Sequence, residues 1–192
     1  AEFALFHSLV GRSGVTPETA RTIVRTNTTT IAALAVKRGD ADGLICGLQG
    51  RYIKHVRDIR SVIGLQDGVS NVSALSMLIM PRGAFFLTDT YVNMDPTPAE
   101  LVAIALQARN HLRRFNIEAR AALLSYSNFG SRDGHSAFKM REVYKLLKAE
   151  APDLIVEGEM QGDLALSEDL RERYIPDSVL RGEANLLIFP NL

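Results

Sequence analysis

The alternation of short apolar runs with amphipathic segments constrains the fold of this chain more than any other feature of its sequence. Strand-like runs occupy residues 121–124, 154–156 and 186–189, with helical spacing in the segments around them. Strands that alternate with helices are typical of a layered α/β/α fold with a mainly parallel sheet. The runs 74–80 and 84–88 are joined by a short Pro/Gly turn and predict an antiparallel hairpin built into that fold.

Capping residues mark where several helices begin. Residues 97–100 read Thr-Pro-Ala-Glu, a capping box with proline at the first helical position, and predict a helix that ends near Arg114. Residues 16–18 read Thr-Pro-Glu and predict another helix start. Further helices are expected over residues 27–39, 52–63, 136–149 and 168–174, and a further short strand over residues 43–47.

The composition excludes several classes of protein. With 22 basic and 22 acidic residues the net charge is zero, which is unlike the bulk charge of a nucleic-acid binder. No apolar run reaches the roughly 18 residues that a membrane helix needs, and we expect no signal peptide. The single cysteine, Cys46, cannot form an internal disulfide and suits a reducing compartment. We therefore expect a cytoplasmic protein with neither nucleic acid nor membrane as a partner.

The two ends of the chain indicate a piece of a longer polypeptide. The chain begins at Ala1 rather than at methionine, and it stops soon after the apolar run 186–189. In α/β folds the loop after a core strand commonly carries function, so a domain seldom stops there. We expect sequence to be missing at both ends.

The loop at residues 125–131, Ser-Tyr-Ser-Asn-Phe-Gly-Ser, is the most informative segment for binding. It leaves a buried strand and precedes a helix, and ligands of open parallel sheets bind beyond the carboxyl ends of strands. Hydroxyl groups, an amide and backbone N–H groups near a glycine suit phosphate or another anion. The alternative is a solvated turn rich in turn-forming residues, which composition alone favours.

Three weaker candidates have simpler alternatives. Asp89 and Asn93 follow a predicted strand and could face a cleft, but Asx-type turn bonding is the favoured interpretation. The segment 157–163 carries three carboxylates without histidine or cysteine, so no metal site is expected there. Arg51 and Arg57 belong to a basic cluster that could grip phosphate, whereas a solvated helix face is the usual explanation.

Sequence motifs that would define a reaction are missing. There is no Walker loop, no Gly-x-Gly-x-x-Gly and no nucleophile elbow, and the four histidines have no metal-ligand spacing. Reasoning from the residues therefore reaches a cytosolic α/β protein with a candidate anion-binding loop, and it does not select the ligand.

Several segments, in order and at matching spacing, resemble phosphotransacetylases, the phosphate acetyl/butyryltransferase family. These segments are residues 122–127 (Ala-Leu-Leu-Ser-Tyr-Ser), 151–154 (Ala-Pro-Asp-Leu), 158–165 (Gly-Glu-Met-Gln-Gly-Asp-Leu-Ala) and 188–192 (Ile-Phe-Pro-Asn-Leu). Four segments more closely resemble the version of this domain that is fused behind the catalytic part of bacterial NADP-dependent malic enzymes: residues 22–28, 45–52, 125–131 and 182–187.

The resemblance implies two α/β lobes with a cleft between them, related to isocitrate and isopropylmalate dehydrogenases. Residues 1–90 would form a partial first lobe, and residues 91–192 a second lobe truncated at its C-terminal end. It also implies that the domain binds acetyl-CoA as an allosteric effector and helps to assemble a homo-oligomer. Oxidative decarboxylation of malate to pyruvate, with NADP and a divalent metal, would belong to a separate malic enzyme domain of the same polypeptide, absent here.

The same resemblance assigns ligand contacts and argues against catalysis by this chain. The residues expected to contact acetyl-CoA or phosphate are Ser125, Ser127, Asn128, Gly130, Ser131, Arg51, Arg57 and Asn93. Phosphotransacetylases carry a hydroxyl-rich stretch where residues 51–55 read Arg-Tyr-Ile-Lys-His, and they need a Ser-Arg segment that lies beyond this chain. No catalytic residue is therefore assigned. Two alternatives stay open: an active phosphate acetyltransferase, and a purely structural oligomerisation module.

Overall fold

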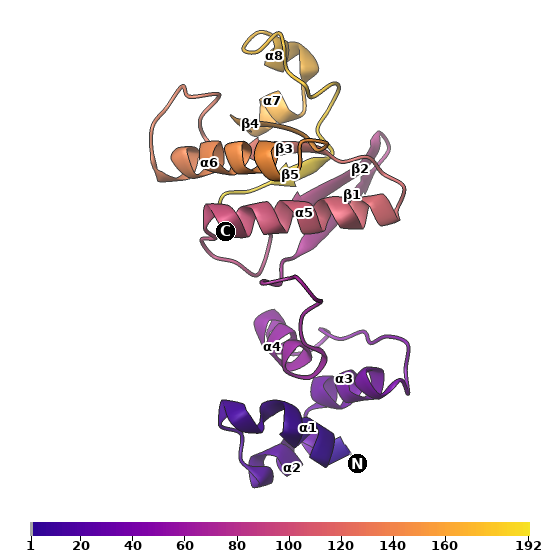
Figure 1. Ribbon diagram of the computed structural model, residues 1–192. Helices are drawn as coiled ribbons and strands as arrows, with labels where there is room; N and C mark the ends of the chain where they lie inside the picture. The colour runs from indigo at the N-terminus through magenta and orange to yellow at the C-terminus, as the bar shows by residue number, and fades with distance from the viewer. Residues whose placement is uncertain (1) are drawn as a thin grey trace. The chain divides into compact units, whose positions relative to one another are not determined.

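The computed structural model describes residues 2–192 and divides the chain into two compact units (Figure 1). Unit 1 ends at Gly68, and unit 2 runs from Val69 to Leu192. The boundary expected from the sequence was residue 90. Residues 69–90 belong to unit 2 because they include a hairpin whose second strand pairs with a strand near the end of the chain.

Unit 1 is helical throughout its regular structure. Its elements are α1 (Glu2–Val10), the 3₁₀ turn η1 (Gly11–Ser13), α2 (Pro17–Thr26), α3 (Thr28–Arg38) and α4 (Tyr52–Ile63). The Thr16 side chain caps α2 and the Asn27 side chain caps α3, as their sequence signals predicted. The helices share one small core of six buried residues: Phe6, Val10, Ala20, Ala33, Leu34 and Val62.

The prediction of a strand at residues 43–47 is wrong. This segment has no strand partner in the described structure, and its cysteine, Cys46, is exposed rather than buried in a core. Ile45 is fully exposed, as is Leu48 beyond it. A strand is stabilised by its neighbours, and the described part of unit 1 contains no sheet that could accept this run.

Unit 2 is built on a five-stranded sheet in the order β1-β2-β5-β3-β4. The strands are β1 (Leu75–Met80), β2 (Gly83–Thr88), β3 (Arg120–Leu124), β4 (Ile155–Met160) and β5 (Leu186–Ile188). β1 and β2 form the antiparallel hairpin, whereas the pairs β2–β5, β5–β3 and β3–β4 are parallel. The predicted fold class, a mainly parallel sheet with an antiparallel hairpin, is confirmed.

Helices cover both faces of this sheet and complete the three layers. On one face, α5 (Pro98–Arg114) and α6 (His135–Glu150) pack over Ala121, Leu123 and Leu186. On the other face, the short helices α7 (Gly162–Ala165) and α8 (Glu168–Glu172) are joined to a cluster that contains the alternate strand residues Ala122, Leu124 and Leu187. Successive residues of a strand point to opposite faces, so one short apolar run serves two cores. None of the described helices is both long and apolar enough to span a bilayer.

Candidate functional site

The loop at residues 125–131, called the corner below, leaves the carboxyl end of β3 and leads toward α6. It brings five of the predicted site residues into one loop: Ser125, Ser127, Asn128, Gly130 and Ser131. Ser127 is completely buried, whereas Gly130 and Ser131 are exposed. The carboxyl edge of a parallel sheet is the usual position for a ligand in this class of fold.

A buried carboxylate, Glu159 on β4, holds the corner in place. Its Oε1 accepts hydrogen bonds from Ser127 Oγ at 2.7 Å, from the Gly130 backbone N–H at 2.9 Å and from Arg141 Nε at 3.0 Å. Burial alone would raise the pKa of Glu159, but the hydrogen bonds from Gly130, Ser127 and Arg141 together lower it. The carboxylate therefore stays charged near neutral pH and serves as the anion that the corner binds.

Other N–H groups of the corner also have partners within the protein. Ser125 Oγ accepts from the Ser127 N–H at 3.2 Å, and Ser131 Oγ accepts from the Asn128 N–H at 2.9 Å. The Asn128 side-chain oxygen accepts from the Gln161 N–H at 2.7 Å. This is the turn-forming chemistry expected of such residues. A ligand at the corner would therefore meet exposed side chains more readily than free backbone N–H groups.

An open pocket of about 330 Å³ lies beside the corner, between α6 and β4. It is lined by Phe129, Gly130, Arg141, Tyr144, Lys145, Gly158 and Glu159. Arg141 is paired with Glu159, so Lys145 is the cation available to a ligand; beside two aromatic rings it suits a ligand with a phosphate group and a flat base. Lys145 has no ion-pair partner among residues 2–192, so its charge is not neutralised by a contact within the chain.

Gly158 allows β4 to approach β3 closely beside this pocket. Its φ of 141° lies in a region that side chains disfavour, and a Cβ there would meet the Leu123 carbonyl oxygen at 2.7 Å. The close approach brings the neighbouring Glu159 to the corner, where the Phe129 N–H also donates to the Glu159 carbonyl at 2.8 Å. Glycine at this position thus contributes directly to the shape of the site.

Comparison with known proteins decides the family. The family model described as "phosphate acetyl/butaryl transferase" matches residues 2–192 of this chain. The chain belongs to this family. The Streptococcus pyogenes phosphotransacetylase structure superimposes with a TM-score of 0.89 at 30% identity, covering 100% of this chain and 60% of that one. The Staphylococcus aureus EutD phosphotransacetylase gives 0.82 at 28% identity, with 98% and 59% coverage.

Among curated relatives of this phosphotransacetylase-family chain, malic enzymes match over only part of their length. The NAD-dependent malic enzyme of Rhizobium meliloti is 61% identical over 97% of this chain and 24% of that protein. The NADP-dependent malic enzyme of Haemophilus influenzae is 50% identical over 97% and 25%. The chain therefore spans about a quarter of these relatives. Its predicted resemblance to the phosphotransacetylase-like part of malic enzymes is confirmed.

The remaining predicted ligand residues lie outside the corner. Asn93 follows the carboxyl end of β2, and its side-chain nitrogen donates to Asp89 and to the Val72 carbonyl. Asp89 also accepts from the N–H groups of residues 91–93, as expected for Asx-type bonding. Arg51 and Arg57 are exposed residues at the start and in the middle of α4, in unit 1. Their ligand contacts, like those of the corner, stay predictions.

The sequence did not indicate that Glu159, Arg141 and Lys145 belong to the site at the corner. The acidic segment 157–163 was noticed for possible metal binding, but its carboxylates have separate protein partners. Glu157 Oε2 accepts from Ser178 Oγ at 3.1 Å, whereas Glu159 is bound to the corner. Across the described part of the chain, no group of three His, Cys, Asp or Glu residues is arranged to hold a metal ion. The contact of Glu159 with the corner depends on the parallel pairing of β3 with β4, which no local sequence signal indicates.

Proposed function

We propose that this chain is the regulatory phosphotransacetylase-like domain of a malic enzyme, binding acetyl-CoA as an allosteric effector and supporting oligomer assembly. Support comes from the malic enzymes, of which the chain matches about a quarter. In the whole protein, malate oxidation and decarboxylation to pyruvate would belong to a catalytic domain of the same polypeptide, with a divalent metal. NADP is the proposed cofactor there, although the relative at 61% identity is named for NAD.

The pocket beside the corner is the observation that carries the ligand part of the proposal. It lies at the carboxyl edge of the sheet and combines the cations Arg141 and Lys145 with the rings of Phe129 and Tyr144. Arginine and lysine suit the phosphates of a CoA ester, and an aromatic ring suits its adenine. At about 330 Å³ the pocket suits one end of the molecule, with the remainder extending over the corner.

Assembly of the oligomer is supported by the edge strand β1. Its pairing partner is β2 on one side only, so its other edge carries backbone groups available for pairing. Met77 is 48% exposed and Ile79 is 80% exposed, which leaves apolar surface along this edge. Allosteric regulation requires acetyl-CoA to favour one assembly or conformation over another.

Calorimetry with acetyl-CoA on the full-length protein tests the proposal. We expect saturable binding, and Lys145→Gln should weaken it about tenfold because a phosphate loses a cation. Lys148→Gln, on the same helix but outside the pocket, removes the same charge and should leave the affinity unchanged. Absence of binding by the full-length protein would remove the regulatory proposal, and equal effects of the two variants would remove the pocket from it.

The second candidate is an active phosphate acetyltransferase. A relative with that name, from Paracoccus denitrificans, is 37% identical over 97% of this chain and 61% of its own length. Such an enzyme would bring the CoA thiolate to acetyl phosphate, with nearby positive charge stabilising the transition state. A thiol-release assay on the full-length protein separates the candidates, because only the enzyme produces sustained turnover.

A purely structural oligomerisation module is the third candidate. Light scattering of the full-length protein with and without acetyl-CoA distinguishes it from a regulatory domain. A structural module keeps the same mass and hydrodynamic radius in both conditions, whereas the regulatory domain responds to the effector.

A further inference from the structure

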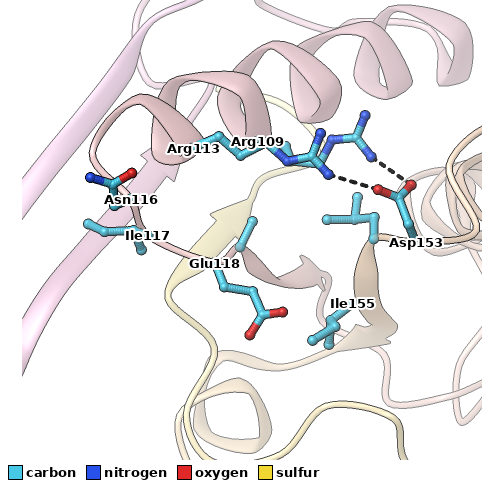
Figure 2. Close-up of a pocket in the computed structure, with 9 residues that line it drawn as sticks. Arg109, Arg113, Asn116, Ile117, Glu118, Asp153 and Ile155 are labelled. Atoms are coloured by element: carbon cyan, nitrogen blue, oxygen red, sulfur yellow. Dashed lines mark hydrogen bonds and ion pairs between the residues drawn. The ribbon is translucent and has the colours of Figure 1, made fainter.

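A second pocket lies at the opposite edge of the sheet from the corner, beside the amino ends of β3 and β4 (Figure 2). Its volume is about 280 Å³. The C-terminal part of α5 supplies Arg109 and Arg113, and the segment after α6 supplies Asp153. Ile117, Leu154 and Ile155 provide apolar lining. Neither the corner nor the proposed acetyl-CoA pocket shares a residue with it.

The two arginines converge on one carboxylate. Arg109 Nη1 donates to Asp153 Oδ1 at 3.1 Å, and Arg113 Nη2 donates to Asp153 Oδ2 at 2.8 Å. Figure 2 shows the two guanidinium groups side by side, facing the carboxylate of Asp153. Two guanidinium groups face the single carboxylate of Asp153; Glu118 also lines the pocket, but neither arginine pairs with it. The geometry of the two arginines around Asp153 matches the way arginines grip a carboxylate or a phosphate.

Arg109 is held more firmly than Asp153 or Arg113, whose side chain is 55% exposed. The Arg109 side chain is only 15% exposed, and its Nε is buried without a hydrogen-bond partner among residues 2–192. The Asp153 side chain is 60% exposed and sits in the short connection between α6 and β4. A fixed guanidinium is preorganised for an anion, whereas an exposed carboxylate separates from its partner at little cost.

We propose that this pocket binds a small organic anion whose carboxylate or phosphate group replaces Asp153 between Arg109 and Arg113. The apolar lining receives the body of the ligand, and Asp153 acts as an internal competitor that the ligand displaces. The volume of the pocket suits a small metabolite and is too small for an entire CoA ester. The site is thus separate in position and in ligand size from the one proposed for acetyl-CoA.

The test is an NMR titration of the 192-residue chain with inorganic phosphate and, separately, with succinate. We expect saturable shifts of the Arg109 and Arg113 side-chain N–H signals and of the Ile155 amide. Asp153→Asn removes the competing charge while keeping the side chain's shape, so it should tighten binding about tenfold. Arg113→Gln, at a side chain that is 55% exposed, should weaken binding by a similar factor without unfolding the chain.

Asp40→Asn in unit 1 is the matched control. Asp40 is also an exposed carboxylate paired with an arginine, at 3.0 Å from Arg38 Nε, but it lies outside the pocket. This variant should bind both anions as the parent chain does. Failure of Asp153→Asn to tighten binding, or of Arg113→Gln to weaken it, overturns the proposal, as does the absence of saturable shifts with both anions. Tighter binding of phosphate or of succinate shows which anionic group the natural ligand carries.

Discussion

The two units of this chain achieve order by different means. Unit 1 depends on one core of six apolar residues, and its loop from 40 to 51 leaves Ile45 and Leu48 in solvent. Unit 2 has an apolar cluster on each face of its sheet and also buries ionisable side chains, such as Glu159 and Arg171, each with several hydrogen bonds. Buried polar networks fix a unique arrangement of loops, which an apolar core alone does less well. The difference suits unit 2 to hold the corner, which we propose as a binding loop, in one arrangement.

The largest effect is expected from emptying each core in turn. Leu34→Ala in unit 1 and Leu123→Ala in unit 2 both remove a side chain that is fully buried, at a cost of about 3 kcal/mol each. Because the core of unit 1 is small, Leu34→Ala should unfold that unit at low urea while unit 2 stays native. Residue-resolved hydrogen exchange across a urea series measures both units. A single transition, shifted equally by both substitutions, would show that the units unfold together and would break the comparison.

The polar network of unit 2 is tested by Glu159→Ala. The substitution leaves Ser127 Oγ, the Gly130 N–H and Arg141 without their buried acceptor, which should cost about 3 kcal/mol and loosen the corner. Urea unfolding of unit 2 and protease cleavage at the corner measure the two effects. Glu172→Ala removes a carboxylate that is 47% exposed and should change neither. Equal behaviour of the two variants would mean that Glu159 does not anchor the corner.

Acid should weaken unit 2 through carboxylates that the fold keeps ionised. Hydrogen bonding to Lys139 lowers the pKa of Asp95, and bonding from the Thr97 backbone lowers that of Glu100. A carboxyl group with a lowered folded-state pKa stabilises the fold above its unfolded value, about 4. That stability is lost as the pH falls through the lowered pKa of the carboxyl group in the folded state. The urea midpoint of unit 2 should therefore drop between about pH 5 and about pH 2. A urea midpoint that stays constant over this pH interval would contradict a stabilising role for the ionised Asp95 and Glu100.

The smallest effect compares two helix caps of similar sequence. Thr97 and Glu100 bond reciprocally, with the Thr97 N–H donating to Glu100 at 2.8 Å. The Thr16 hydroxyl accepts from the Thr19 N–H at 3.3 Å and bonds to the Thr19 hydroxyl at 2.9 Å, but no carboxylate accepts from the Thr16 backbone there. Thr97→Ala should cost about 1 kcal/mol, and Thr16→Ala about half of that. Chemical denaturation of each variant gives the two values, and serine at either position should restore most of the loss. A larger loss at Thr16 would reverse this order.

Sequence reasoning predicted the elements of unit 2 well because their signals are local. The capping box at Thr97 and the continuous apolar run at residues 121–124 depend on neighbours along the chain; the box forms, and all four residues of the run are buried in a strand. The same reasoning failed at residues 43–47, where an apolar run stays exposed. It also omitted α1 (Glu2–Val10), which has no capping signal in the sequence that would mark its start. An apolar run alone does not indicate whether a neighbouring strand is present to pair with it.

The candidate site was predicted in part. The corner at residues 125–131 was identified because strand ends and turn-forming residues are visible in the sequence. Its bond to Glu159 was not, since that contact joins residues 32 positions apart and depends on the parallel pairing of β3 and β4. The pair Arg109 and Asp153 is 44 positions apart and escaped for the same reason.

The strand β5 lies in the middle of the sheet although it is the last of the described strands along the chain. Only three residues, Leu186–Ile188, pair with β2 on one side and with β3 on the other. During synthesis on the ribosome, the hairpin and the β3–β4 pair must therefore wait for these residues before they can join. The nascent chain exposes its apolar strand faces until then, so chaperone binding should concentrate on this stage of translation, while unit 1 is already complete.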